Sequence, residues 1–159
     1  MDVNVKKYCF RDTDDAGDAE YDIVGDDYRR LIGFCCDHAA VFSVIATNDK
    51  ASLFKKIAPY EISKPENIKY IHEHYGDASL DIRYYKVCPQ LYDTIVSNTD
   101  NIFCWINGWG HCNPEDPVFF RKDGSVLFDS IIHDGECSLY IKDEDAGHIV
   151  CNPLWQATP

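Results

Sequence analysis

The spacing of hydrophobic residues predicts that helices dominate the first two thirds of the chain. In the clearest case Tyr28, Leu31 and Cys35 recur at helical spacing. The aspartates before this pattern can cap a helix, and Pro89 suits the first turn of another because the first residues of a helix need no N–H partner. The predicted helices span residues 26–37, 50–57, 65–76 and 89–98.

Runs rich in β-branched and aromatic residues predict strands between and after these helices. The apolar run 40–47 is typical of a buried strand, and 81–87 alternates as a half-buried strand does. Turns at Gly124 and Gly135 divide the last third into three strands of an antiparallel meander. The predicted strands span residues 6–10, 40–47, 81–87, 101–106, 118–121, 125–132 and 136–141.

These elements together predict a single α+β domain spanning residues 1–159. Helices pack on a mainly antiparallel sheet that ends in the C-terminal β-meander. With 45% hydrophobic and 13% aromatic residues, the chain has enough apolar material for one core. No internal repeat, linker or low-complexity tract divides the sequence.

The chain is expected in the cytoplasm. Met1 is followed by charged and polar residues instead of the apolar core of a signal peptide. The longest apolar stretch, residues 39–46, is too short to cross a bilayer. The eight cysteines are scattered and lie mostly inside hydrophobic runs, which indicates buried free thiols in a reducing compartment.

The net charge of −12 is concentrated in two segments. Residues 1–27 carry nine acidic and three basic side chains, and residues 129–145 carry six acidic and one basic. The residues between them are almost neutral. A field of this sign repels nucleic acid and anionic membranes and attracts basic proteins or cations. The charge therefore predicts a basic protein partner, with no nucleic acid and no membrane.

Metal and cofactor motifs are absent from the sequence. An EF-hand that began at Asp12 would need an oxygen ligand at its fifth position and a glutamate at its twelfth, where the chain has Ala16 and Ile23. His72 and His74 are two residues apart, so on the predicted helix they would point in nearly opposite directions. Nucleotide-binding glycine patterns are also missing. We expect no metal and no cofactor.

A cysteine-dependent hydrolase or transferase is the alternative from another class of function. Cys88, Cys104 and Cys112 are candidate nucleophiles, with His111 or His133 as the base. No local signature marks any of them as reactive, so no catalytic residue is assigned. A subunit of a larger assembly is a third alternative.

The loop Asn107-Gly-Trp109-Gly-His111 is the most unusual local feature. One interpretation, which we favour because large aromatic side chains are mostly buried, is that Trp109 folds back over the core. The other is an exposed aromatic anchor, a type of residue enriched where proteins bind one another.

The combination of one small domain, segmental acidity and absent catalytic motifs resembles the profile of bacterial immunity proteins. Such proteins are encoded beside a toxin and bind it tightly, and they share no common fold. The resemblance rests on the acidic segments Asp12 to Asp27 and Asp129 to Asp145, the aromatic loops and the reduced cysteines. It implies an inhibitor whose carboxylates meet a basic toxin surface, such as the cleft of a nuclease.

We therefore expect the partner-binding residues in the acidic segments and in the aromatic loop. Carboxylates that complement a positive cleft steer association, while a few aromatic anchors supply affinity. If the fold brings the two acidic segments together, they form one acidic face. The candidate residues are Asp12, Asp14, Asp15, Asp18, Glu20, Trp109, Asp143, Glu144 and Asp145.

Overall fold

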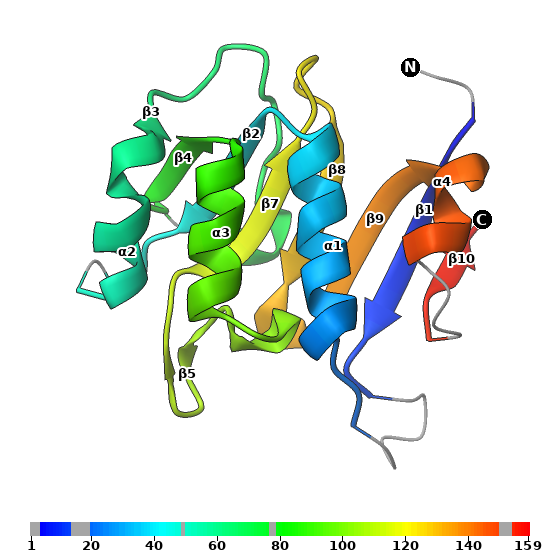
Figure 1. The fold of residues 1–159 in the computed structure, drawn as a ribbon, viewed down its shortest axis with the longest axis horizontal. Coiled ribbons are helices and arrows are strands. Elements are labelled where there is room, and N and C mark those ends of the chain that lie inside the picture. Colours follow the sequence, from blue (N-terminus) through cyan, green and yellow to red (C-terminus); the bar gives the residue numbers. More distant parts are fainter. Residues whose placement is uncertain (1–3, 14–19, 49, 77–78, 150–153) are drawn as a thin grey trace.

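The computed structural model of the protein has the predicted α+β architecture, with helices on one face of a mainly antiparallel sheet (Figure 1). It describes residues 4–13, 20–48, 50–76, 79–149 and 154–159. The helices are α1 (Gly25–His38), α2 (Ser52–Ile57), α3 (Pro89–Asn98) and α4 (Asp143–Ile149). No helix in the described part of the chain is long and apolar enough to cross a membrane.

Eight strands form the main sheet, in the order β10-β1-β9-β8-β7-β2-β4-β3, and every pairing in it is antiparallel. The C-terminal meander predicted from the sequence is β7–β8–β9, and β7 is buried along its whole length. The strands are β1 (Val5–Arg11), β2 (Val41–Ile45), β3 (Glu61–Ile62), β4 (Ile82–Lys86), β7 (Glu115–Phe120), β8 (Val126–Ile131), β9 (Glu136–Lys142) and β10 (Gln156–Thr158). A separate hairpin consists of β5 (Asn107–Gly108) and β6 (His111–Cys112).

The main core lies between the sheet and the helices, and it includes the fully buried Trp105. The indole N–H of Trp105 donates to the hydroxyl of Tyr28 on α1 over 2.9 Å. That hydroxyl in turn lies 2.6 Å from the hydroxyl of Thr99 at the end of α3. Burying these polar atoms carries little penalty because each has a partner. The chain of contacts fixes α1 and α3 against the core.

The first helix begins at Gly25, one residue before the start predicted from the sequence. Asp26 and Asp27 do not cap α1 but lie in its first turn, where carboxylates are favoured by the helix dipole. Each also forms an ion pair with the arginine three residues later, over 2.6 and 2.9 Å. At α3 the prediction is confirmed, because Pro89 occupies the first turn.

The segment of residues 63–76, called the cover segment here, crosses the face of the sheet opposite the helices. The helix predicted over 65–76 is wrong: most of the segment has no regular secondary structure, with a turn closed by the N–H of Ile68 on the carbonyl of Pro65 and a 3-10 turn, η2 (Glu73–Tyr75). Ile68 and His72 are 2% and 4% exposed, whereas Ile71, which a helix would have buried, is 69% exposed. The alternation of Ile68, Tyr70 and His72 is the period of an extended chain. Ile68 packs with Val118 and Phe120 of β7 in a second cluster.

Two further differences concern short elements. The strand predicted over 101–106 is wrong, because this run forms a 3-10 turn, η3 (Ile102–Cys104), and then a buried bend. The consecutive residues Cys104, Trp105 and Ile106 at its end are all buried, which breaks the alternation of a half-exposed strand. The sequence did not predict α4, β3, β10 or the β5–β6 hairpin.

The cover segment approaches the turn between β7 and β8 so closely that Gly124 is required there. A Cβ at Gly124 would lie 2.3 Å from the carbonyl oxygen of Asn67, whereas one at Gly110 would have no atom within 4 Å. Both glycines have left-handed φ angles, 86° and 84°. Gly110→Ala should therefore reduce the free energy of unfolding by only about 1–2 kcal/mol, the cost of placing a side chain on a left-handed backbone. Gly124→Ala should lose about 1–3 kcal/mol more, because the backbones must separate.

Urea unfolding of the two variants measures this difference. Equal losses of stability would show that the cover segment does not pack on the β7–β8 turn.

Candidate functional site

Two carboxylates that the sequence analysis did not single out are buried at the start of β7. Glu115 and Asp116 are 3% and 0% exposed. Asp116 has a φ of 49°, one of only two positive values among the non-glycine residues that the structure describes. Such a conformation is uncommon and is kept only where the surroundings impose it.

Asp116 joins β7 to two other elements. Its Oδ1 accepts the backbone N–H of Ile132 over 2.8 Å, at the start of η4 (Ile132–Asp134). Its Oδ2 accepts the hydroxyl of Tyr75 over 2.8 Å and lies 3.2 Å from Nε2 of His74, both in the cover segment. Burial raises the pKa of this carboxyl, and the hydrogen bonds from Ile132 and Tyr75 oppose that rise.

Glu115 joins the same strand to the β5–β6 hairpin and again to η4. Its Oε1 accepts the backbone N–H of Asn107 over 2.9 Å, which anchors the base of the hairpin. Its Oε2 lies 3.1 Å from Nε2 of His133. Adjacent carboxylates thus attach the hairpin, η4 and the cover segment to the central strand.

Trp109 lies at the tip of the anchored hairpin and is 73% exposed. The favoured prediction, that it folds back over the core, is wrong. Trp109 and Gly110 have φ angles of 51° and 84°, and positive values at both positions define a two-residue I′ turn. Trp105 already fills the core beneath. The indole instead meets the ring of His133 edge-on, with the centroids 6.2 Å apart.

The first acidic segment reaches the same end of the sheet through Gly135. The N–H of Asp12 donates to the carbonyl of Gly135 over 2.7 Å, and Thr13 bridges to Glu20. Asp12 is partly buried, and burial together with the charges of Glu20, Asp22 and Glu136 raises its pKa. Asp14, Asp15 and Asp18 lie outside the described residues.

The second acidic segment is divided between the two ends of the β1–β9 ribbon. β9 runs antiparallel to β1, from Glu136 opposite Arg11 to Lys142 opposite Val5. Asp134 and Glu136 therefore join the first segment, whereas Asp143, Glu144 and Asp145 begin α4 at the far end (Figure 1). There Asp143 accepts from Lys6 over 2.6 Å and from the hydroxyl of Tyr8 over 2.7 Å. Among the residues that the structure describes, the acidic side chains of the two segments do not form one continuous face.

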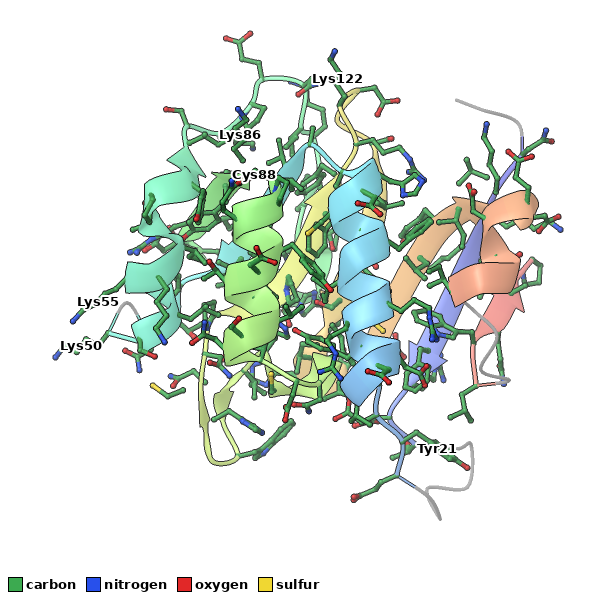
Figure 2. All side chains as sticks on the ribbon, viewed as in Figure 1. Tyr21, Lys50, Lys55, Lys86, Cys88 and Lys122 are labelled. Carbon is green, nitrogen blue, oxygen red and sulfur yellow. The ribbon has the colours of Figure 1, made fainter. Side chains whose placement is uncertain are left out.

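The arrangement defines a candidate docking surface, the Trp109 surface, made of Trp109, His133, Asp134, Asp12 and Glu20. Trp109, Asp134 and Glu20 are exposed, so they are accessible to a partner. Figure 2 shows Lys50, Lys55, Lys86 and Lys122 around α2 and the opposite end of the sheet, away from Tyr21 at the end of the acidic loop. Basic side chains also lie among the acidic ones, since Arg11 pairs with Glu136 and Arg29 with Asp26.

The candidate catalytic thiols do not gather into a reactive site. Cys104 is 3% exposed, and burial raises its pKa to about 12, which opposes formation of the nucleophilic thiolate. Cys112 is exposed, and its sulfur accepts a hydrogen bond from the side chain of Asn48 over 3.0 Å. Among the described residues no three His, Cys, Asp or Glu side chains lie together as metal ligands would.

Comparison with known proteins gives no family: no protein-family model, no curated protein and no solved structure matches the chain. The fold and the surface define an α+β protein with an exposed, anchored aromatic hairpin and, at the same end of the sheet, the acidic residues Asp12, Glu20 and Asp134.

His72, beside this site in the cover segment, makes stability depend on pH. Its Nδ1 is buried without a hydrogen-bond partner, and the rings of Tyr70, His74 and Tyr75 surround it. Burial, aided by the charge of His74, lowers its pKa from 6.5 to about 4. As the pH falls, the unfolded chain takes up this proton first. The stabilising contribution is therefore complete above pH 6.5 and decreases as the pH falls toward 4.

The free energy of unfolding should accordingly fall between pH 7 and pH 5 by about 2 kcal/mol more in the native protein than in His72→Phe. The phenyl ring keeps an aromatic group at this position but binds no proton. Burial raises the pKa values of Asp116 and Asp129, so their protonation increases the free energy of unfolding as the pH falls. This contribution is present in both proteins and cancels in the comparison. His38→Phe, at an exposed position of α1, is the control. Identical pH profiles for the native protein and His72→Phe would contradict this account.

Proposed function

We propose that the protein is a binding and inhibitory protein of the immunity type, which neutralises a basic toxin by covering it with the Trp109 surface. The observation that carries the proposal is a tryptophan 73% exposed at the tip of a hairpin whose base is tied to a buried carboxylate. Exposed tryptophan is unfavourable in a free protein but supplies large contact area in an interface.

The fixed conformation of the hairpin supports an interface function. Besides the contact with Glu115, the N–H of Asn113 donates to the carbonyl of Ile106 and its side-chain amide to that of Cys104. A tip held in this way loses little conformational freedom on binding, so more of the contact energy appears as affinity.

The neighbouring carboxylates support a basic partner. Asp134 directly follows His133, which contacts the indole, and Asp12 is bound to the next residue, Gly135. Negative charge beside an anchor speeds association with a positive surface and opposes binding to nucleic acid. The proposal keeps Asp12, Glu20 and Trp109 from the sequence prediction, and leaves Asp143, Glu144 and Asp145 outside the binding surface.

The cysteines are in keeping with action in the cytoplasm, where the proposal places the protein. All the cysteines that the structure describes are free thiols. Several are buried, as small hydrophobic residues are. The alternative of a cysteine-dependent enzyme loses one of its candidate nucleophiles, because burial raises the pKa of the Cys104 thiol to about 12.

The proposal is tested by isolating the partner and measuring its affinity for matched variants. The full chain is used as bait in a lysate of the cells that encode it, and the captured protein is purified and titrated by calorimetry. We expect a basic protein whose toxic activity the chain blocks. Trp109→Ala should weaken binding by about 2–4 kcal/mol. Asp134→Lys should slow association by about tenfold at low salt.

Glu144→Lys, at the far end of β9, is the matched charge control and should leave affinity unchanged. A partner that is acidic, that keeps its activity in the complex, or that binds Trp109→Ala and Asp134→Lys as tightly as the native chain would overturn the proposal. Size measurement of the protein, purified and in lysate, tests whether it is instead a subunit of a larger assembly.

A further inference from the structure

The sheet is split between β8 and β9 at the end remote from the Trp109 surface. These strands pair only from Phe128 opposite Leu139 to Ile131 opposite Glu136. Val126 of β8 and Tyr140 of β9 lie beyond the last pair, so β8 and β9 are not paired with each other there, although Val126 pairs with Phe120 and Tyr140 with Lys7 on their other sides. Unpaired groups inside a sheet are unfavourable unless another donor or acceptor reaches them.

The side chain of Arg121 fills part of this split. Its guanidinium donates from Nη1 to the carbonyl of Val126 over 2.8 Å and from Nη2 to the carbonyl of Tyr140. Among the described residues no carboxylate lies within 4.0 Å of it as an ion-pair partner. Arg121 is therefore a partly buried cation that is held in place by neutral carbonyls and has no direct counterion.

A pocket of about 570 Å³ occupies the space around this arginine, between α1 and α4. This volume is within the range of small-molecule sites. Its apolar wall includes Phe34, whose ring stacks on that of His38 with the centroids 4.2 Å apart. The apolar side chains that line it are Val5, Phe34, Val126, Leu127 and Tyr140.

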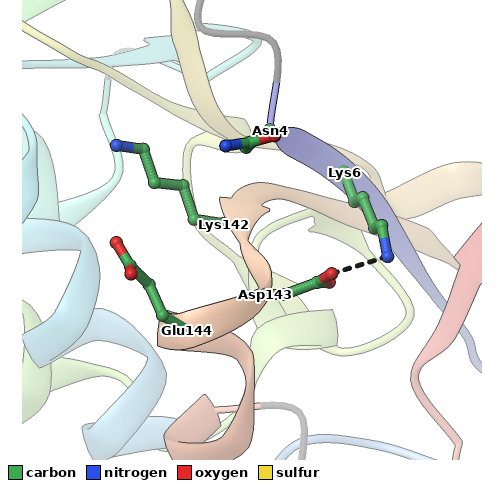
Figure 3. A pocket seen from close by; sticks show the side chains of 5 residues that line it. All are labelled: Asn4, Lys6, Lys142, Asp143 and Glu144. Atoms are coloured by element: carbon green, nitrogen blue, oxygen red, sulfur yellow. Dashed lines mark hydrogen bonds and ion pairs between the residues drawn. The ribbon is translucent and has the colours of Figure 1, made fainter.

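Charges of both signs line the same pocket. Arg121 and Lys142 supply positive charge, and Glu144 and Asp145 at the start of α4 supply negative charge, with Asp123 at the β7–β8 turn. Figure 3 shows the neighbouring pocket, which is lined by Asn4, Lys6, Lys142, Asp143 and Glu144 and shares Lys142 and Glu144 with the pocket around Arg121. In it the side chains of Lys142 and Glu144 extend to the same side, away from the ion pair of Lys6 and Asp143. A purely anionic ligand would meet the carboxylates of α4, and a purely cationic one would meet Arg121.

We propose that this pocket binds a small zwitterion with an apolar body, the chemistry of an apolar α-amino acid. The ligand carboxylate pairs with Arg121, its ammonium group with Asp145 and Glu144, and its side chain contacts the wall formed by Phe34 and Leu127. The ligand supplies the counterion that Arg121 lacks, and a charge-assisted pair of this kind is among the stronger hydrogen bonds in proteins. The site is independent of the Trp109 surface.

The test compares three probes of similar shape on the full-length protein by NMR titration of backbone amides. L-phenylalanine carries both charges, 3-phenylpropionate only the negative one and 2-phenylethylamine only the positive one. We expect L-phenylalanine to bind with a dissociation constant about tenfold or more below that of either analogue. The amides of Leu127, Tyr140 and Asp145 should shift most.

Variants assign the binding to the pocket. Asp145→Asn should weaken the binding of L-phenylalanine by about tenfold and should not weaken the binding of 3-phenylpropionate. Only the ammonium group of the ligand loses its partner in this variant. Asp93→Asn, at an exposed position of α3, is the matched control and should change neither. This test does not require a substitution of Arg121, whose side chain bonds to both β8 and β9.

Three results would overturn the proposal: no saturable shifts with L-phenylalanine, equal affinity for all three probes, or shifts located away from the pocket. Tight binding of 3-phenylpropionate alone would also overturn it, since the pocket would then select an anion.

Discussion

The burial of two adjacent carboxylates at the start of β7 is the constraint on which the functional end of the molecule depends. Removing a carboxylate from water is unfavourable by several kcal/mol unless donors replace the lost solvation. Glu115 and Asp116 obtain those donors from Asn107, Ile132 and Tyr75, and from two imidazoles. The donors come from three different elements, so satisfying the carboxylates fixes the hairpin, η4 and the cover segment relative to the sheet.

The Trp109 surface follows from this constraint. A hairpin with two residue pairs is at best marginally stable alone in water. Its conformation is held because Asn107 at its base is bound to Glu115, while His133, bound to the same side chain, meets the indole at its tip. The same interaction that stabilises the fold thus presents an apolar anchor to solvent in one orientation.

Much of the fold could be predicted from local patterns, because α1 and α3 bury one face at helical spacing and the apolar runs of β7, β8 and β9 are separated by turns at Gly124 and Gly135. The conformation of the cover segment could not be predicted in this way. Ile68 and His72 are four residues apart, and this spacing places them on the same face of either a helix or an extended chain. The sequence shows which segments are acidic, but it does not show which acidic residues lie close together. The register of β1 on β9 determines that, and it places Asp134 and Asp143 at opposite ends of β9. Glu115 and Asp116 were missed because their partners are distant in sequence. The only local signal was their position directly before a fully apolar run.

The most direct test of this account is amide hydrogen exchange at Asn107 and Ile132, followed by NMR. Their N–H groups donate to the buried carboxylates, in the first case at the base of a small hairpin that would otherwise open freely. The account predicts that both amides are protected in the native protein, and that Glu115→Ala, which removes the acceptor, abolishes the protection of Asn107 while leaving that of Val44 in the core. Exchange of Asn107 in the native protein as fast as that of the exposed Gly110 at the hairpin tip would contradict it.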